Sequence, residues 1–192
     1  YTNKGITKLS DLSGTKMWMW EGDPIAKATF KAMDFSPIPL GMTDVLMALQ
    51  TNMIDGFYVS PYGAVSLQWH TKVNHMLDMP MANAVGAVIV SKKKFDEIPE
   101  AYQDTVLKLG QKYMKQLTKL GREDNGKVLE ELKASGMTFT QIENQEEMNK
   151  ILAGGEKARE ELVKKGIFSK ELLEKVETKL QELRNEKTDQ SN

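Results

Sequence analysis

Apolar and polar residues alternate in a short segment near the start of the chain. In KMWMW, residues 16–20, the side chains of Trp18 and Trp20 fall on one face and those of Met17 and Met19 on the other. A period of two is typical of a β-strand. Because both faces are apolar, we expect this strand to be buried.

The pattern changes to a helical period directly after this strand. Residues 23–35 fit a helix with Asp23 as the N-cap and Pro24 at the first helical position. A helix that opens just after a strand is a common place for an anion or another ligand. The apolar face of the predicted helix consists of Ile25, Ala28, Phe30 and Met33.

The alternation of strands and helices continues over the next segment. We expect a strand over 38–40, a helix capped by Thr43 and running through Leu49, and a strand over 54–59. Strand, helix, strand, helix, strand is the order of a parallel α/β lobe. The fold class predicted for this part is therefore α/β.

The rest of the chain is dominated by helical patterns. A run of lysines, Lys92 to Lys94, favours a solvated loop, and Gly136 stands where a helix C-cap is expected. The predicted elements are a helix over 61–72, two extended segments within 73–95 joined through Pro80, a long amphipathic helix within 96–136, a lone strand over 137–142 and a broken helix over 144–185. The apolar stripe of the long helix comprises Val106, Leu109, Tyr113, Leu117 and Leu120.

The composition narrows the possible classes of protein. With 192 residues, 40% of them apolar, the chain suits one large domain or two small lobes with a real core. A formal charge of −1 gives no positive field for nucleic acid, and no run approaches the roughly 20 apolar residues of a membrane span. The absence of cysteine excludes disulfides and thiolate metal sites. The first residues contain no leader, so we expect targeting information to be absent or removed.

The sequence contains none of the common catalytic motifs. It has no G-x-S-x-G, no H-E-x-x-H, no P-loop and no G-x-G-x-x-G. His70 and His75 are five residues apart, which does not suit two metal ligands on one helix face. We therefore expect a protein that is not an enzyme and that holds no metal or cofactor.

Three predicted strand-to-helix junctions offer a ligand site, because ligands of open α/β sheets bind beyond the carboxyl ends of the strands. The junctions run from Trp20 to Asp23, from Leu40 to Asp44 and from Tyr58 to Tyr62. Two interpretations remain open: the tryptophans are core residues, or they line a pocket. The candidate ligand-binding residues are Trp18, Trp20, Glu21, Asp23, Thr43, Tyr58, Ser60 and Tyr62.

Several segments, in this order, resemble one known family. They are LSDLSGTKMWMW at 9–20, PIPLGMTDVLMALQTNMIDGFYVSP at 37–61 and GAVIVSKKKFDEIPEAYQDTV at 86–106. Together with the long helix that follows, they are similar to the DctP family, the solute-binding subunit of tripartite ATP-independent periplasmic (TRAP) transporters. The likeness covers about residues 8 to 135, and the combination is more specific than any one segment.

The resemblance implies a type II periplasmic-binding-protein fold, in which two α/β lobes close on a solute and a long helix spans both. It implies a monomeric periplasmic receptor that delivers a small organic solute to TRAP membrane subunits. It also implies that family members carry a further N-terminal segment, so that this chain is a fragment. We expect the second-lobe core at 1–80, a crossover and spanning helix at 81–135, and packing helices at 136–192.

Two departures from the family pattern leave the solute open. The strand corresponding to KMWMW usually presents an arginine to the solute's carboxylate, and here that position is Trp18. The usual DGQENP-type motif is replaced by DGFYVSP, with Ser60 nearest the place of the asparagine. One hypothesis is a neutral, aromatic or partly cationic solute. The other is an organic acid held by an arginine outside this chain.

Two functions of other classes remain as alternatives. One is an α/β enzyme whose catalytic half lies in an N-terminal segment outside this chain. The other treats the helices rich in acids and lysines near the C-terminus as an arm that binds another protein.

Overall fold

The first half of the chain forms a small parallel sheet with helices at its edges. A computed structural model describes residues 1–82 and 85–189. Strand β1 (Trp18–Trp20) pairs in parallel with β2 (Ile38–Leu40), with Trp18 opposite Ile38. Helix α1 (Pro24–Ala32) connects them, as the period of the apolar residues predicts. Both predicted strands and the helix between them are confirmed.

The segment predicted as a strand over 54–59 is not one. It runs beside β1, where the Trp18 N–H donates to the Gly56 carbonyl at 2.8 Å, but it pairs only through isolated bridges at Gly56. Helix α3 (Pro61–Ser66) begins directly after it, so the chain turns away from β1 before a ladder of several residues can form. The prediction of an extended segment holds, and that of a regular strand is wrong.

The beginning of the chain joins two separate sheets. Thr2 bridges Gly56 on one side and His75 on the other, both in the antiparallel sense. His75 belongs to β3 (His75–Leu77), which pairs in parallel with β4 (Thr138–Thr140). The strand predicted as lone over 137–142 therefore has a partner. The hydrogen-bonded order is β2, β1, the Gly56 segment, the Thr2 segment, β3 and β4.

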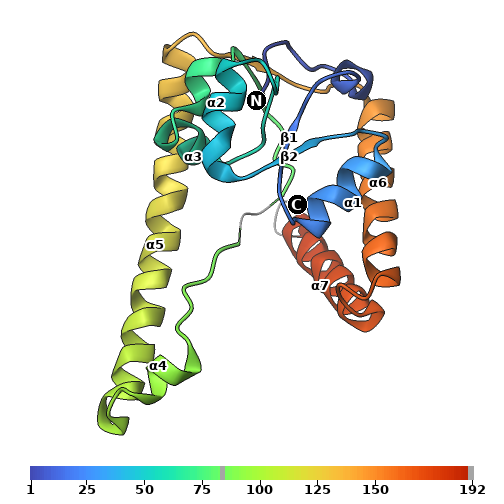
Figure 1. The fold of residues 1–192 in the computed structure, drawn as a ribbon. Helices are drawn as coiled ribbons and strands as arrows, with labels where there is room; N and C mark the ends of the chain where they lie inside the picture. Colours follow the sequence, from blue (N-terminus) through green and yellow to red (C-terminus); the bar gives the residue numbers. More distant parts are fainter. Residues whose placement is uncertain (83–84, 190–192) are drawn as a thin grey trace.

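Helices cover this layer on two sides. In Figure 1, α2 (Val45–Gln50) and α3 lie on one side of β1 and β2, and α1 and α6 (Gln145–Lys164) on the other. The main core lies beside α2 and α3. A smaller core lies between α1 and α6 and consists of Ala28, Ala158 and Leu162. The main core consists of Trp18, Val45, Ala48, Leu49, Ile54, Phe57, Ala64, Trp69 and Val73.

The long helix is confirmed as α5 (Glu100–Ala134). Its last turns pack on the body through the buried side chains of Val128 and Leu132. Figure 1 shows its first part projecting away from the body, and the predicted apolar stripe of that part is exposed. Gly136 follows the helix with a φ of 90°, as expected of a glycine at a helix C-terminus.

The lysine run does not form a loop. Lys92 to Lys94 belong to a short helix, α4 (Lys92–Asp96), which Ser91 caps by accepting a hydrogen bond from the Lys94 N–H. An ion pair of 2.9 Å between Lys92 and Asp96, one turn apart, adds a small stabilisation. The predicted solvent exposure is correct, and the predicted loop is wrong.

The predicted helix cap at Thr43 is also wrong. Thr43 lies inside a 3₁₀ turn, η2 (Met42–Asp44), and α2 starts after Asp44. No side chain accepts a hydrogen bond at that cap. The other elements are the 3₁₀ turns η1 (Leu9–Leu12) and η3 (Trp69–Lys72) and the helix α7 (Lys170–Asp189).

We predict that Gly56→Ala destabilises the protein. An added Cβ would stand 2.5 Å from the Tyr1 carbonyl oxygen and 2.8 Å from the Met17 sulfur, so the segments joined at Gly56 would have to separate. The expected loss is about 1–3 kcal/mol of unfolding free energy, measured by urea denaturation.

The matched control is Gly126→Ala in α5, where an added Cβ meets nothing within 4 Å. Because alanine favours a helix over glycine, this variant should be more stable by about 0.5–1 kcal/mol. Equal effects of the two substitutions would contradict the close approach at Gly56.

Candidate functional site

The three predicted strand-to-helix junctions converge at one edge of the layer. β1, β2 and the Gly56 segment are neighbours and run in parallel, so their carboxyl ends lie together. Hydrogen bonds link the three ends. The Trp20 N–H donates to the Tyr58 hydroxyl at 3.3 Å, and the Glu21 N–H donates to the Leu40 carbonyl at 3.3 Å.

At the first junction, the turn between β1 and α1 depends on Gly22 and Asp23. Gly22 has a φ of 81°, and the Asp23 N–H donates back to the Trp20 carbonyl at 3.2 Å. The Asp23 carboxylate then accepts hydrogen bonds from the N–H groups of Ile25 and Ala26, at 2.9 and 3.0 Å. The predicted N-cap is confirmed, and Glu21 beside it is exposed.

At the third junction, Ser60 and Tyr62 are fixed by hydrogen bonds at the start of α3. The Ser60 hydroxyl accepts from the Gly63 N–H at 3.2 Å. The Tyr62 N–H donates to the side-chain oxygen of Asn125, on α5, at 3.0 Å. At the second junction, Thr43 is exposed in η2.

The two tryptophans of β1 have different environments. Trp18 is 2% exposed, and its indole N–H donates to the Leu40 carbonyl at 3.0 Å. Its ring stacks on Tyr58 with centroids 5.3 Å apart and meets Trp69 edge-on at 5.2 Å. Trp20 is 47% exposed. Trp18 is thus a core residue underneath the edge, whereas Trp20 lies on its surface.

Two further exposed aromatic residues, Tyr58 and Tyr62, belong to the third junction, and the Tyr58 hydroxyl accepts a hydrogen bond from the Trp20 N–H. Tyr58 is 37% exposed and Tyr62 50% exposed. Phe30, on α1, lies beside Tyr58 with ring centroids 6.0 Å apart. This edge therefore presents flat apolar ring surfaces next to polar hydroxyl groups.

The pKa of Tyr58 is raised above the ordinary value for a phenol. Burial is the main cause, and the negative charge of Asp23 acts in the same direction, while the hydrogen bond from the Trp20 N–H opposes them. At neutral pH the hydroxyl therefore keeps its proton and can donate a hydrogen bond.

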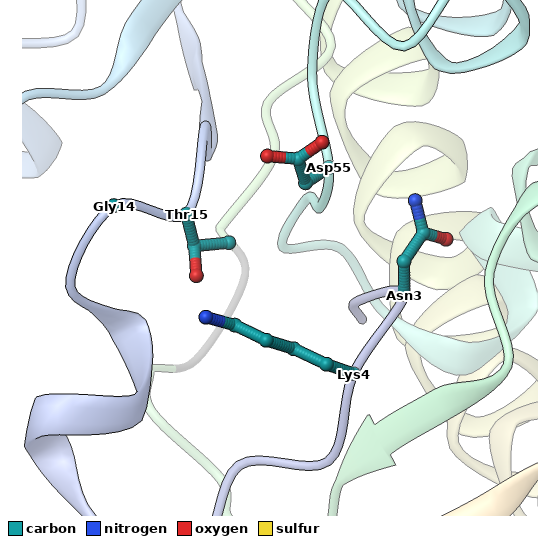
Figure 2. Close-up of a pocket in the computed structure, with 5 residues that line it drawn as sticks. All are labelled: Asn3, Lys4, Gly14, Thr15 and Asp55. Carbon is teal, nitrogen blue, oxygen red and sulfur yellow. The ribbon is translucent and has the colours of Figure 1, made fainter.

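Two hollows of the surface lie away from this edge. One has a volume of about 170 Å³ and is formed by Asn3, Lys4, Gly14, Thr15 and Asp55 (Figure 2). Gly14 and Thr15 precede β1, so this hollow lies at the amino ends of the parallel segments. A second one is lined by Leu9, Ser10, Ser13, Met33, Asp34, Phe35, Glu147 and Lys150. Neither contains a candidate ligand-binding residue.

The histidines do not form a metal site. The His70 Nδ1 lies 3.2 Å from the Ala64 carbonyl, and the His75 Nδ1 is buried without a hydrogen-bond partner. Within residues 1–82 and 85–189, no three His, Cys, Asp or Glu side chains come together to hold a metal ion. In the same part of the chain, no helix combines the length and apolar character needed to cross a bilayer.

Comparison with known families decides the class of this fold. Residues 1–165 match the DctP family, described as bacterial extracellular solute-binding protein, family 7. The chain belongs to this family. The family consists of periplasmic binding proteins rather than enzymes, which confirms the predicted class and localisation.

Individual relatives support the assignment and show what share of their length this chain matches. A solute-binding protein of a Sulfitobacter species is 27% identical over 146 residues, which are 74% of this chain and 43% of that protein. The 2,3-diketo-L-gulonate-binding periplasmic protein YiaO of Escherichia coli is 26% identical over 132 residues, 67% of this chain and 39% of YiaO. The chain therefore spans about two fifths of the length of these curated relatives.

A solved structure confirms the predicted fold class. The TRAP periplasmic solute-binding protein of Citrobacter koseri with bound D-glucuronate matches with a TM-score of 0.70 and 25% identity. The match covers 85% of this chain and 53% of that one. The fold is the α/β, periplasmic-binding-protein-like fold that the resemblance implies.

Sequence reasoning missed three residues that shape this edge. Phe30 was assigned only to the apolar face of a helix, and Trp69 only to a helical segment. Both are aromatic residues in helical segments that follow predicted strands, and this position indicates a place near the carboxyl edge of the sheet. Asn125 lies 63 residues from its partner Tyr62, and no local pattern points to it.

We predict that the two tryptophans respond differently to truncation. Trp18→Ala should cost about 3–5 kcal/mol of unfolding free energy, because it leaves a cavity between Tyr58 and Trp69. Trp20→Ala should cost about 1 kcal/mol, because half of its side chain is already in water. Urea denaturation monitored by circular dichroism measures both, and similar losses would contradict the assignment of Trp18 to the core.

Proposed function

We propose that the protein is an extracytoplasmic receptor that captures a small organic solute and delivers it to the membrane subunits of a TRAP transporter. The observation that carries this proposal is the convergence of three strand-to-helix junctions at an edge with exposed aromatic rings, in a chain of a solute-binding family. The edge would form one wall of the solute cleft.

We propose a role for each candidate residue in this wall. Trp20, Tyr58 and Tyr62 would cover the solute with ring surfaces, and their polar groups would orient it. Trp18 would support Tyr58 and Trp20 from below. The remaining candidates, which would shape the polar rim, are Glu21, Asp23, Thr43 and Ser60.

The names of relatives guide the choice of solutes to test. YiaO binds 2,3-diketo-L-gulonate, and the Citrobacter koseri protein holds D-glucuronate. Both are small organic acids, so an organic acid is one candidate class for this protein. The ring surfaces at the edge support a second class, an aromatic or neutral compound.

A panel of solutes tests the receptor function. We expect one class among sugar acids, aromatic acids and amines to raise the unfolding midpoint of the protein in its full natural length. A solute at 100 times its Kd adds about 2.7 kcal/mol of stability by mass action. Differential scanning calorimetry measures the midpoint. A midpoint that no class changes would contradict the proposal.

We also propose that the other wall of the cleft contacts residues 81–135. Residues 85–90 are exposed and belong to no helix or strand, and they form no backbone hydrogen bond within the described part of the chain. Their apolar side chains and the apolar stripe of α5 are exposed, and exposed apolar surface of this kind marks an interaction site. The proposed division is a second-lobe core at 1–80, a crossover and spanning helix at 81–135, and packing helices at 136–192.

Hydrogen exchange tests this division. In the full-length protein the amides of residues 85–90 should exchange slowly, because the strand would pair with a sheet of the other lobe. In residues 1–192 expressed alone the same amides should exchange as fast as an unstructured peptide. Fast exchange in both proteins would show that the crossover has no partner.

A further inference from the structure

At the first and third junctions, side-chain acceptors already occupy the helix N–H groups to which an anion would bind. Helix N-termini attract anions because their first N–H groups are free. At α1 these groups already donate to Asp23. At α3 the Gly63 and Tyr62 N–H groups donate to Ser60 and Asn125.

The indole group beneath the edge is equally occupied. The indole N–H of Trp18 donates to the Leu40 carbonyl, and the ring is buried. The strand position at the centre of the edge therefore offers a solute neither a positive charge nor a free donor.

Two acidic side chains, Glu21 and Asp23, stand at the first junction of this edge. Neither Glu21 nor Asp23 forms an ion pair within the described part of the chain, and the charge that acts on the Tyr58 hydroxyl is that of Asp23. The α1 dipole supplies about half a positive charge at this end. Two carboxylates outweigh it, so the net charge beside the rings remains negative.

The ring surfaces complement this charge. Trp20 and Tyr58 expose π-faces, and a cation over such a face is attracted by the ring quadrupole. A carboxylate over the same face would meet both the negative face of the ring and the unpaired acids.

From these observations we propose that the part of the solute facing this wall is a flat ring carrying a positive charge or N–H donors, held on Trp20 and Tyr58 and paired with Glu21 and Asp23. This inference rests on the proposed receptor function and names the solute class of the same wall. Arylalkylamines, which join a flat ring to an ammonium group that stays protonated at neutral pH, are the simplest compounds with this chemistry.

Three probes separate the solute classes in the full-length protein. Phenethylamine and phenylacetate share a ring and differ in charge, and D-glucuronate is an acid without an aromatic ring. By titration calorimetry we expect phenethylamine to bind about tenfold more tightly than phenylacetate, because the ring contacts are shared and the charge is not. Tighter binding of either acid would overturn the inference and leave the receptor function standing.

Charge variants locate the effect. The double variant Glu21→Gln, Asp23→Asn keeps the helix cap, since asparagine caps as well as aspartate. It should remove most of the tenfold preference for the amine. Glu143→Gln, an exposed acid that follows β4 at the far end of the layer, is the matched control and should leave the preference unchanged. A preference that survives the double variant would overturn the inference.

Ring variants locate the stacking surface. Trp20→Ala should weaken phenethylamine binding about tenfold, and Trp20→Phe should retain most of the affinity. Unchanged affinity in Trp20→Ala would place the ring elsewhere and contradict the proposal. If none of the three probes binds, this inference fails, and the broader solute panel decides separately whether the receptor function holds.

Discussion

The fold depends on the close approach of three backbone segments at Gly56. β1 lies on one side of this residue and the first residues of the chain on the other, at distances that leave no room for a side chain. This contact joins two sheets of only two strands each into one layer. Since a two-stranded sheet is marginally stable alone, the joined layer and its helices supply the stability. The orientation of the proposed cleft wall relative to β3 and β4 follows from the same contact.

The aromatic residues connect the core with the surface. Trp69 packs edge-on against both Trp18 and Phe57, and Trp18 in turn stacks on Tyr58, which reaches the solvent. Rings in such a chain have few rotamers, so the exposed face of Tyr58 is held in place before any solute arrives. Preorganisation of this kind lowers the entropic cost of binding.

Local patterns predicted those parts of the fold that local physics determines. The alternation in KMWMW predicted β1, and the Asp23 and Pro24 pair predicted the start of α1. The Ser91 cap and the Lys92–Asp96 pair are sequence features that indicate the helix α4. The interpretation of the lysine run as a loop did not use them. Non-local contacts could not be read in this way. The different burial of Trp18 and Trp20, which share one strand face, depends on Trp69, 51 positions beyond Trp18 in the sequence. The resemblance to a family predicted the overall fold, which no local pattern determines.

The hydrogen bond between Asn125 and Tyr62 has a mechanical consequence. It attaches α5 directly to the edge of the proposed cleft, while the helix begins 25 residues earlier at Glu100. At a rise of 1.5 Å per residue, that arm is about 37 Å long. A tilt of about 10° around Asn125 would then move its far end by about 6 Å. Because Asn125 lies near one end of α5, a small change in the angle of the helix at the edge of the proposed cleft corresponds to a much larger displacement of its far end.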